Sequence, residues 1–189
     1  MSANVTAPAA SQSTTAASTD HVVRSSLGRR VIAALRIVIG FNFLWSFLDS
    51  TFGLGYSTSS EDAWIAGASP TEGYLMGASD GAFGAAWEAM AGNPVVDVLF
   101  MLALLGLGVA AISGAGLRIA AIAGLLLAGS MYLSQLPLEA GEANNPLTTD
   151  HWYYVLLFAM FPLVDAGRTW GVAGIWERFS IVQRFPWLR

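Results

Sequence analysis

A set of polar side chains flanks the long apolar runs of this sequence and has the residue types needed to move protons. It comprises two carboxylates, a phenol, a carboxamide and an imidazole: Asp49, Asp97, Tyr132, Gln135 and His151. Histidine titrates near neutrality, and a neighbouring carboxylate can tune its pKa. If one cavity gathers these groups, His151, Asp97 and Asp49 are the candidate catalytic residues, while Tyr132 and Gln135 would hydrogen-bond a quinone.

A plainer interpretation of the same region stays open. Asp49 and Asp150 could each end a helix in water without any chemical task. The nearby aromatic residues could form the belt that membrane proteins place at the lipid–water interface. That belt would comprise Tyr132, Trp152, Tyr153 and Tyr154.

Two charged residues, Arg36 and Asp165, stand within or at the end of apolar runs. A charge in hydrocarbon costs about 2.5 to 3.5 kcal/mol on insertion scales, so each of these residues needs a partner or a task. Because both are expected at a similar depth from the same side, we predict a structural ion pair between Arg36 and Asp165. Two alternatives remain: Arg36 snorkels to the membrane surface, or it binds an anionic or quinone head group.

The elements that must position these residues follow from the composition. Hydrophobic residues make up 54% of the 189-residue chain and charged residues 12%, and the mean hydropathy is +0.54. Soluble domains have roughly 25% charged residues, whereas runs of about 20 apolar residues cross a bilayer. The sequence therefore predicts an all-α integral membrane protein, a four-helix bundle with spans at about 31–48, 95–113, 117–136 and 150–166.

The other segments are polar or amphipathic. The chain is therefore expected to have three parts: a disordered cytoplasmic tail (1–28), a membrane domain (29–168) with an acidic outer loop (49–94), and an interfacial C-terminal segment (169–189). Helical spacing of Phe83, Trp87 and Met90 predicts a short helix within residues 80–90 that caps the bundle or lies on the membrane. The Trp and Arg residues of the C-terminal segment predict an amphipathic helix on the cytoplasmic side.

The distribution of arginine gives an independent check on the topology. All nine basic residues are arginine, and cytoplasmic flanks of membrane proteins collect positive charge. Apart from Arg36, they occur before the first predicted span, after the second, and after the fourth; the two intervening loops carry acidic residues and no arginine. We therefore expect a multi-pass protein of the cell membrane with both termini in the cytoplasm and the lipid bilayer as its first partner.

The inventory of metal-ligating and redox residues is small. The chain has no Cys and two His, which removes disulfides, Cys-ligated iron–sulfur clusters and thiol redox chemistry. We expect no haem, iron–sulfur cluster or metal bound by this chain alone, and no nucleic-acid partner. If electrons pass through, a quinone or the cofactor of a partner subunit would carry them.

Several motifs occur in a characteristic order. They are Arg36 in the first span, SPTEGYLMG at 69–77, AGNP at 91–94, Asn145-Pro146 before His151, and DAGRTWG at 165–171. This order resembles the DoxX/DoxD family of four-span membrane proteins over about residues 30–178. Similarity to the DoxD branch implies a membrane subunit of a thiosulfate:quinone oxidoreductase, and similarity to DoxX more broadly implies a membrane partner of redox or detoxifying enzymes.

We therefore expect a membrane subunit that contributes a quinone-facing site to an oxidoreductase complex and acts only with partner subunits. Thiosulfate is a dianion that needs basic groups or helix N-termini, whereas the outer loops are acidic, so a partner would bind it. The alternative is a non-catalytic accessory or scaffold protein of a respiratory or redox-stress complex. Transport of a small solute is less favoured, because the spans have few polar residues to line an aqueous path.

Overall fold

The computed structural model describes residues 22–138, 145 and 147–189, and this part of the chain is helical, without strands. Three helices are long and apolar enough to cross a membrane: α1 (Ser26–Phe52), α4 (Pro94–Ser113) and α5 (Leu117–Ser134). The prediction of an all-helical chain with membrane-spanning segments is confirmed at this level. Residues 1–21 of the predicted disordered tail lie outside the described residues.

Local sequence explains where the long helices begin and end. The side chain of Ser25 accepts a hydrogen bond from the N–H of Gly28 and caps α1, which starts inside the predicted tail. Asn93 caps α4 in the same way through the N–H of Val95, and Pro94 fits the first helical position because its missing N–H would have no partner there. Gly114 ends α4 with a positive φ of 74°, which glycine adopts without strain.

The fourth apolar helix, α6 (His151–Leu163), is shorter than the others, with 13 residues. At 1.5 Å per residue it is about 20 Å long, whereas a hydrocarbon core is about 30 Å thick. Pro162 stands near its end, and a 3₁₀ turn, η2 (Ala166–Arg168), follows. The predicted span at 150–166 is therefore only partly α-helical.

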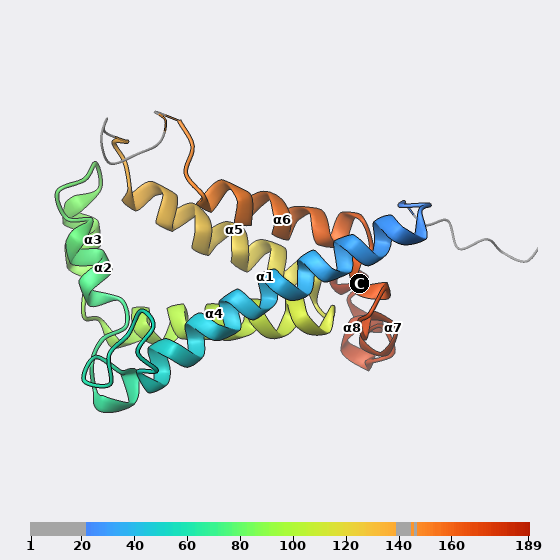
Figure 1. The fold of residues 1–189 in the computed structure, drawn as a ribbon, viewed down its shortest axis with the longest axis horizontal. Coiled ribbons are helices and arrows are strands. Elements are labelled where there is room, and N and C mark those ends of the chain that lie inside the picture. The colour runs from blue at the N-terminus through green and yellow to red at the C-terminus, as the bar shows by residue number, and fades with distance from the viewer. Residues whose placement is uncertain (1–21, 139–144, 146) are drawn as a thin grey trace, which may run out of the picture.

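The long helices pack in two pairs, α1 along α4 and α5 along α6, as Figure 1 shows. The pairs lie close together at the end that carries the C-terminus and diverge toward the opposite end. Glycine permits the tight contact in the first pair: a Cβ at Gly40 would lie 2.7 Å from the backbone nitrogen of Ile112, and one at Gly108 would lie 2.7 Å from that of Leu44. The buried core between the pairs includes Phe43, Met101, Leu104, Leu107, Phe158 and Phe161.

Large apolar side chains cover the outward faces of these helices. Examples that are exposed are Val38, Phe41, Leu99, Leu102, Leu126 and Leu156. Water-soluble monomers rarely expose so much contiguous apolar surface, whereas a lipid environment accommodates it. The exposed faces and the helix lengths together give the chain the character of a membrane protein.

Short helices occupy the connections at both ends of the bundle. The loop after α1 contains η1 (Trp64–Ala66), α2 (Glu72–Gly77) and α3 (Gly84–Met90). The helix predicted within 80–90 is thus present but shorter, and α2 was not anticipated. In Figure 1, α2 and α3 lie where the two helix pairs diverge.

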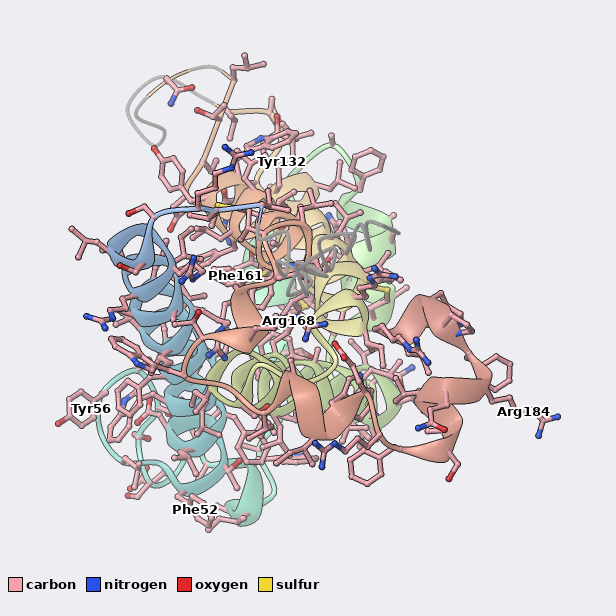
Figure 2. The ribbon with its side chains drawn as sticks, turned by 90° about the vertical axis from the view of Figure 1, so that its right-hand side faces the viewer. Phe52, Tyr56, Tyr132, Phe161, Arg168 and Arg184 are labelled. Atoms are coloured by element: carbon pink, nitrogen blue, oxygen red, sulfur yellow. The ribbon has the colours of Figure 1, made fainter. Side chains whose placement is uncertain are left out.

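The C-terminal segment does not form the single amphipathic helix that the sequence predicts. It consists of three short pieces: α7 (Ala173–Trp176), α8 (Ser180–Arg184) and η3 (Pro186–Leu188). Phe179 interrupts the helix with an extended backbone (φ −65°, ψ 136°), and Pro186 prevents its continuation. The indole of Trp176 donates to the carbonyl of Leu188 at 2.9 Å and folds the segment back on itself. Figure 2 shows Arg184 extending away from the molecule at this end.

Candidate functional site

The polar residues singled out from the sequence stand at the end of the bundle opposite the C-terminus. This end holds the last turns of α1 and α5 and the first turns of α4 and α6. Asp49 and Asp97 belong to the α1–α4 pair, whereas Tyr132, Gln135 and His151 belong to the α5–α6 pair. In Figure 2, Tyr132 lies on one side of the molecule and Phe52, near Asp49 in sequence, lies on the other. No hydrogen bond or ion pair joins the two groups within the described ranges.

Asp49 anchors the loop that follows α1. Its residue is 1% exposed, and its carboxylate accepts hydrogen bonds from the backbone N–H groups of Tyr56 (3.3 Å), Ser57 (2.8 Å) and Thr58 (3.0 Å). A carboxylate that accepts several N–H bonds is strongly held in place. Asp49 therefore has a structural task, which agrees with the plainer interpretation of this residue.

Asp97 plays a similar role for the segment that leads into α2. It lies in the first turn of α4, where the helix dipole favours a negative charge. Its Oδ1 accepts from the hydroxyls of Ser69 (2.8 Å) and Thr71 (2.6 Å) and from the N–H of Thr71 (3.3 Å). The SPTEGYLMG segment at 69–77 is thereby tied to the start of α4.

Tyr132 and Gln135 lie at the end of α5. The Tyr132 hydroxyl donates to the carbonyl of Leu147 at 2.9 Å, and its ring packs edge-on against Trp152 at a centroid distance of 5.5 Å. Gln135 follows the last residue of α5 and is exposed. The phenol predicted to bind a quinone thus fixes the loop before α6.

His151 is nearly buried, and one of its two ring nitrogens has no described hydrogen-bond partner. It opens α6 and is 8% exposed. Its Nδ1 lies 3.1 Å from the Thr149 hydroxyl and 3.5 Å from the Asp150 carboxylate. No described residue hydrogen-bonds Nε2. The imidazole is therefore oriented from one side and open on the other.

Tyr74 joins this corner, although sequence reasoning did not select it. Its hydroxyl hydrogen-bonds the hydroxyl of Ser134 at 2.7 Å and donates to the carbonyl of Met131 at 3.3 Å. Burial raises the pKa of the Tyr74 hydroxyl; the hydrogen bond with Ser134 opposes this rise, and the Asp150 charge adds to it. We call Tyr74, Ser134, Asp150 and His151 the histidine corner. The Tyr74–Ser134 contact spans 60 residues, so no local pattern indicates it.

Arg36 does not form the ion pair with Asp165 that the sequence predicts. Its residue is 0% exposed, and its guanidinium donates to the carbonyls of Ala111, Ile112 (3.0 Å), Thr169 (3.3 Å) and Trp170 (3.2 Å). The Arg–carboxylate ion pair within the described ranges is Arg168–Glu177, at 2.8 Å.

The difference arises from position: the guanidinium meets the last carbonyls of α4, and no described contact joins it to Asp165. The last carbonyls of a helix lack intrahelical partners and carry the negative end of its dipole. Asp165 is exposed in a left-handed conformation (φ 51°). Because Arg36 is completely buried, it does not snorkel to the membrane surface. Both Nη atoms are hydrogen-bonded, and only Nε lacks a partner among the described residues.

Glycines shape the space around this guanidinium. A Cβ at Gly114 would lie 2.9 Å from Arg36 Nη1, and one at Gly171 would lie 3.1 Å from Nη2. A Cβ at Gly167 would lie 2.2 Å from the carbonyl oxygen of Gly114. The glycines of the DAGRTWG motif therefore allow the backbone after α6 to reach the α4–α5 hairpin and the buried arginine.

Comparison with known proteins gave no match: no family model, no curated protein and no solved structure is similar to the chain. Within the described part of the chain, no group of three or more His, Asp or Glu side chains is placed to hold a metal ion. In the histidine corner, a nearly buried imidazole lies beside the hydroxyl of Thr149 and the carboxylate of Asp150.

Proposed function

We propose that the chain crosses the membrane four times, with α6 and the following 3₁₀ turn as the fourth crossing. Together they run from His151 to Arg168, of which α6 supplies about 20 Å, and α6 lies along α5. Its exposed face carries Leu156 and Leu163, which are 62% and 73% exposed. The arginines outside Arg36 all belong to segments at the end that carries the C-terminus, which supports a cytoplasmic location for that end.

We further propose that the protein is the membrane subunit of a quinone-linked redox complex, similar to the DoxD branch, with the quinone head group at the histidine corner. The observation that carries this proposal is the near-complete burial of His151. Its Nδ1 lies beside Thr149 and Asp150, and its Nε2 has no described hydrogen-bond partner. A quinone oxygen would accept a hydrogen bond from the Nε2–H group. As electrons from the donor on a partner subunit reduce the quinone, this oxygen would take up the proton from Nε2.

The sulfur substrate of such a complex would bind elsewhere. Asp150 lies beside His151, the loop after α1 carries several carboxylates, and the sequence between Arg36 and Arg118 contains no basic residue. A thiosulfate dianion would be repelled from this end. In this proposal a partner subunit binds the electron donor, and the present chain handles the quinone and its protons.

A second function, that of a non-catalytic scaffold in a respiratory or redox-stress complex, is favoured by a different observation. Asp49, Asp97 and Tyr132, which were candidates for chemistry, are engaged by hydrogen bonds that hold the fold together, and so is Arg36, which was predicted to form an ion pair. Those bonds stabilise a structured outer cap that a partner protein would contact. The two functions differ in whether the isolated subunit binds a quinone at His151.

The test is a quinone titration of the purified protein in lipid nanodiscs. The proposal predicts that His151→Gln weakens binding of a short-chain ubiquinone or menaquinone analogue by about tenfold or more, because a buried hydrogen bond is lost. His21→Gln changes the chain's other histidine and is the matched control. Equal affinity of both variants, or no binding by the wild type, would contradict the quinone site and favour the scaffold. Identification of proteins that co-purify with the chain would then name the complex.

A further inference from the structure

A second polar region, on the α1–α4 side of the outer end, forms a pocket of about 850 Å³. It lies between the end of α1, the loop through η1 to α2, and the start of α4. Its lining combines three carboxylates with two aromatic rings and several hydroxyls: Asp62, Glu72, Asp97, Trp64, Tyr74 and Ser69. None of the described residues that line it is Arg, Lys or His. The pocket therefore has a concentrated negative charge with no cation beside it.

Asp97 differs from the surface carboxylates of the pocket because its side chain is largely buried. The residue is 5% exposed, yet it belongs to the pocket lining. The three hydrogen bonds that it accepts all go to Oδ1, and no described residue donates to Oδ2. Oδ2 is not a fully enclosed atom and stays accessible at the wall of the pocket. A largely buried carboxylate is normally paired with a cation or fully hydrogen-bonded, and Oδ2 is the oxygen left to meet a cation in the pocket.

The other lining residues indicate which kind of cation fits. A volume of about 850 Å³ lies in the range of pockets that hold organic ligands, and it far exceeds the space a bare metal ion occupies. Trp64 and Tyr74 belong to the lining, and aromatic rings are groups that attract ammonium and guanidinium ions through cation–π interactions. The described residues also lack a cluster of three or more side chains that could hold a metal.

We propose that this pocket binds a nitrogen-centred organic cation, an alkylammonium or guanidinium group, with Asp97 Oδ2 and Glu72 as its anionic partners. The cation is either a free polyamine or the Lys or Arg side chain of a partner subunit; the recognition chemistry is the same. This site shares Tyr74 with the histidine corner, but His151 does not line the pocket, and the variants that test the two proposals change different residues. Either site can therefore fail in experiment while the other stands.

The experiment uses calorimetric titration of the full-length protein in nanodiscs at low ionic strength, where charge attraction is least screened. The probes are spermidine and the blocked peptide acetyl-Gly-Arg-Gly-amide. Glu72→Gln and Asp97→Asn each remove one charge, and the Asn variant keeps an oxygen that can accept from Ser69 and Thr71. Asp80→Asn removes an exposed outer-loop charge that does not line the pocket and is the matched control.

The proposal predicts saturable binding that Glu72→Gln and Asp97→Asn each weaken by about tenfold or more, while Asp80→Asn leaves it unchanged. Binding of spermidine alone identifies a free amine as the ligand, and binding of the peptide alone identifies a partner's side chain. Absence of saturable binding by both probes would overturn the proposal. So would an equal loss in Asp80→Asn, or Ca²⁺ binding of equal strength with the same dependence on Glu72 and Asp97. If Asp97→Asn fails to fold, the comparison of Glu72→Gln with Asp80→Asn decides.

Discussion

Replacement of Arg36 by Met tests the claim that one buried guanidinium holds the basic end of the bundle together. The substitution keeps a long, flexible side chain but removes every donor. It leaves the carbonyls of Ala111 and Ile112 at the end of α4, and those of Thr169 and Trp170 after α6, without their partner. Three segments that are distant in sequence lose their shared contact.

The expected magnitude follows from the burial of these groups. A hydrogen bond to a charged group contributes about 1.5–3 kcal/mol, and a buried acceptor left without a partner costs about 1–3 kcal/mol. The Thr169 and Trp170 carbonyls are only partly buried and regain some solvation. We therefore expect Arg36→Met to lower the free energy of unfolding by about 3–5 kcal/mol, a large share of the 5–15 kcal/mol that is typical of proteins.

The assay is reversible unfolding in mixed detergent–SDS micelles, monitored by tryptophan fluorescence. Arg30→Met removes an exposed arginine at the start of the same helix and serves as control. Arg36→Lys keeps the charge and three donors and should fall between the two. Trypsin should also cut faster after the exposed Arg168 in Arg36→Met. If the two Met variants unfold within about 0.5 kcal/mol of each other, the structural role assigned to Arg36 is wrong.

Three further predictions concern other parts of the fold. Gly124→Ala should lower the free energy of unfolding by about 1–3 kcal/mol, because the new Cβ would lie 2.8 Å from the Phe158 ring. At Gly129 nothing lies within 4 Å of a Cβ, so Gly129→Ala should stabilise the protein by at most about 1 kcal/mol. Similar losses of stability in both variants would contradict this packing of α5 against α6. Asp49→Asn should speed hydrogen exchange at the amides of residues 56–58, which the carboxylate holds; unchanged exchange would refute this anchor. Burial raises the pKa of Tyr74 in the folded protein. The contribution of its neutral phenol to the free energy of unfolding is therefore complete below the ordinary tyrosine pKa and is lost as the pH rises through the folded-state pKa. Tyr74→Phe should abolish this loss in a measurement of unfolding free energy against pH, and an unchanged pH profile would contradict the prediction.

The sequence predicts the long helices well because their signals are local. Hydropathy locates the apolar runs, and the Asn93-Pro94 step and Gly114 mark the ends of α4 through backbone geometry that these residues favour. Helix α2 was not predicted because a segment of six residues has no hydrophobic period long enough to recognise. The C-terminal segment has the composition of an interfacial helix, but composition does not reveal the break at Phe179.

The partners of the polar residues could not be predicted, because they come from distant backbone. Arg36 reaches acceptors 75 and 134 residues away, and sequence shows charged side chains as candidate partners but not the free carbonyls at a helix end. Asp97 binds residues 26 and 28 positions upstream. The sequence correctly places the polar residues at one end of the bundle, but it does not show that the two helix pairs diverge there and separate Asp49 and Asp97 from His151.

The measurement that tests the central claim most directly is the membrane topology. The chain contains no cysteine, so a single introduced thiol reports one position. A membrane-impermeant maleimide applied to intact cells should label Ser60→Cys and Leu147→Cys, both at exposed positions in the outer loops, but should label Ser26→Cys and Ser180→Cys only after the membrane is opened. Labelling of positions 60 and 180 from the same side would contradict the four-span arrangement, and with it the location of both proposed sites.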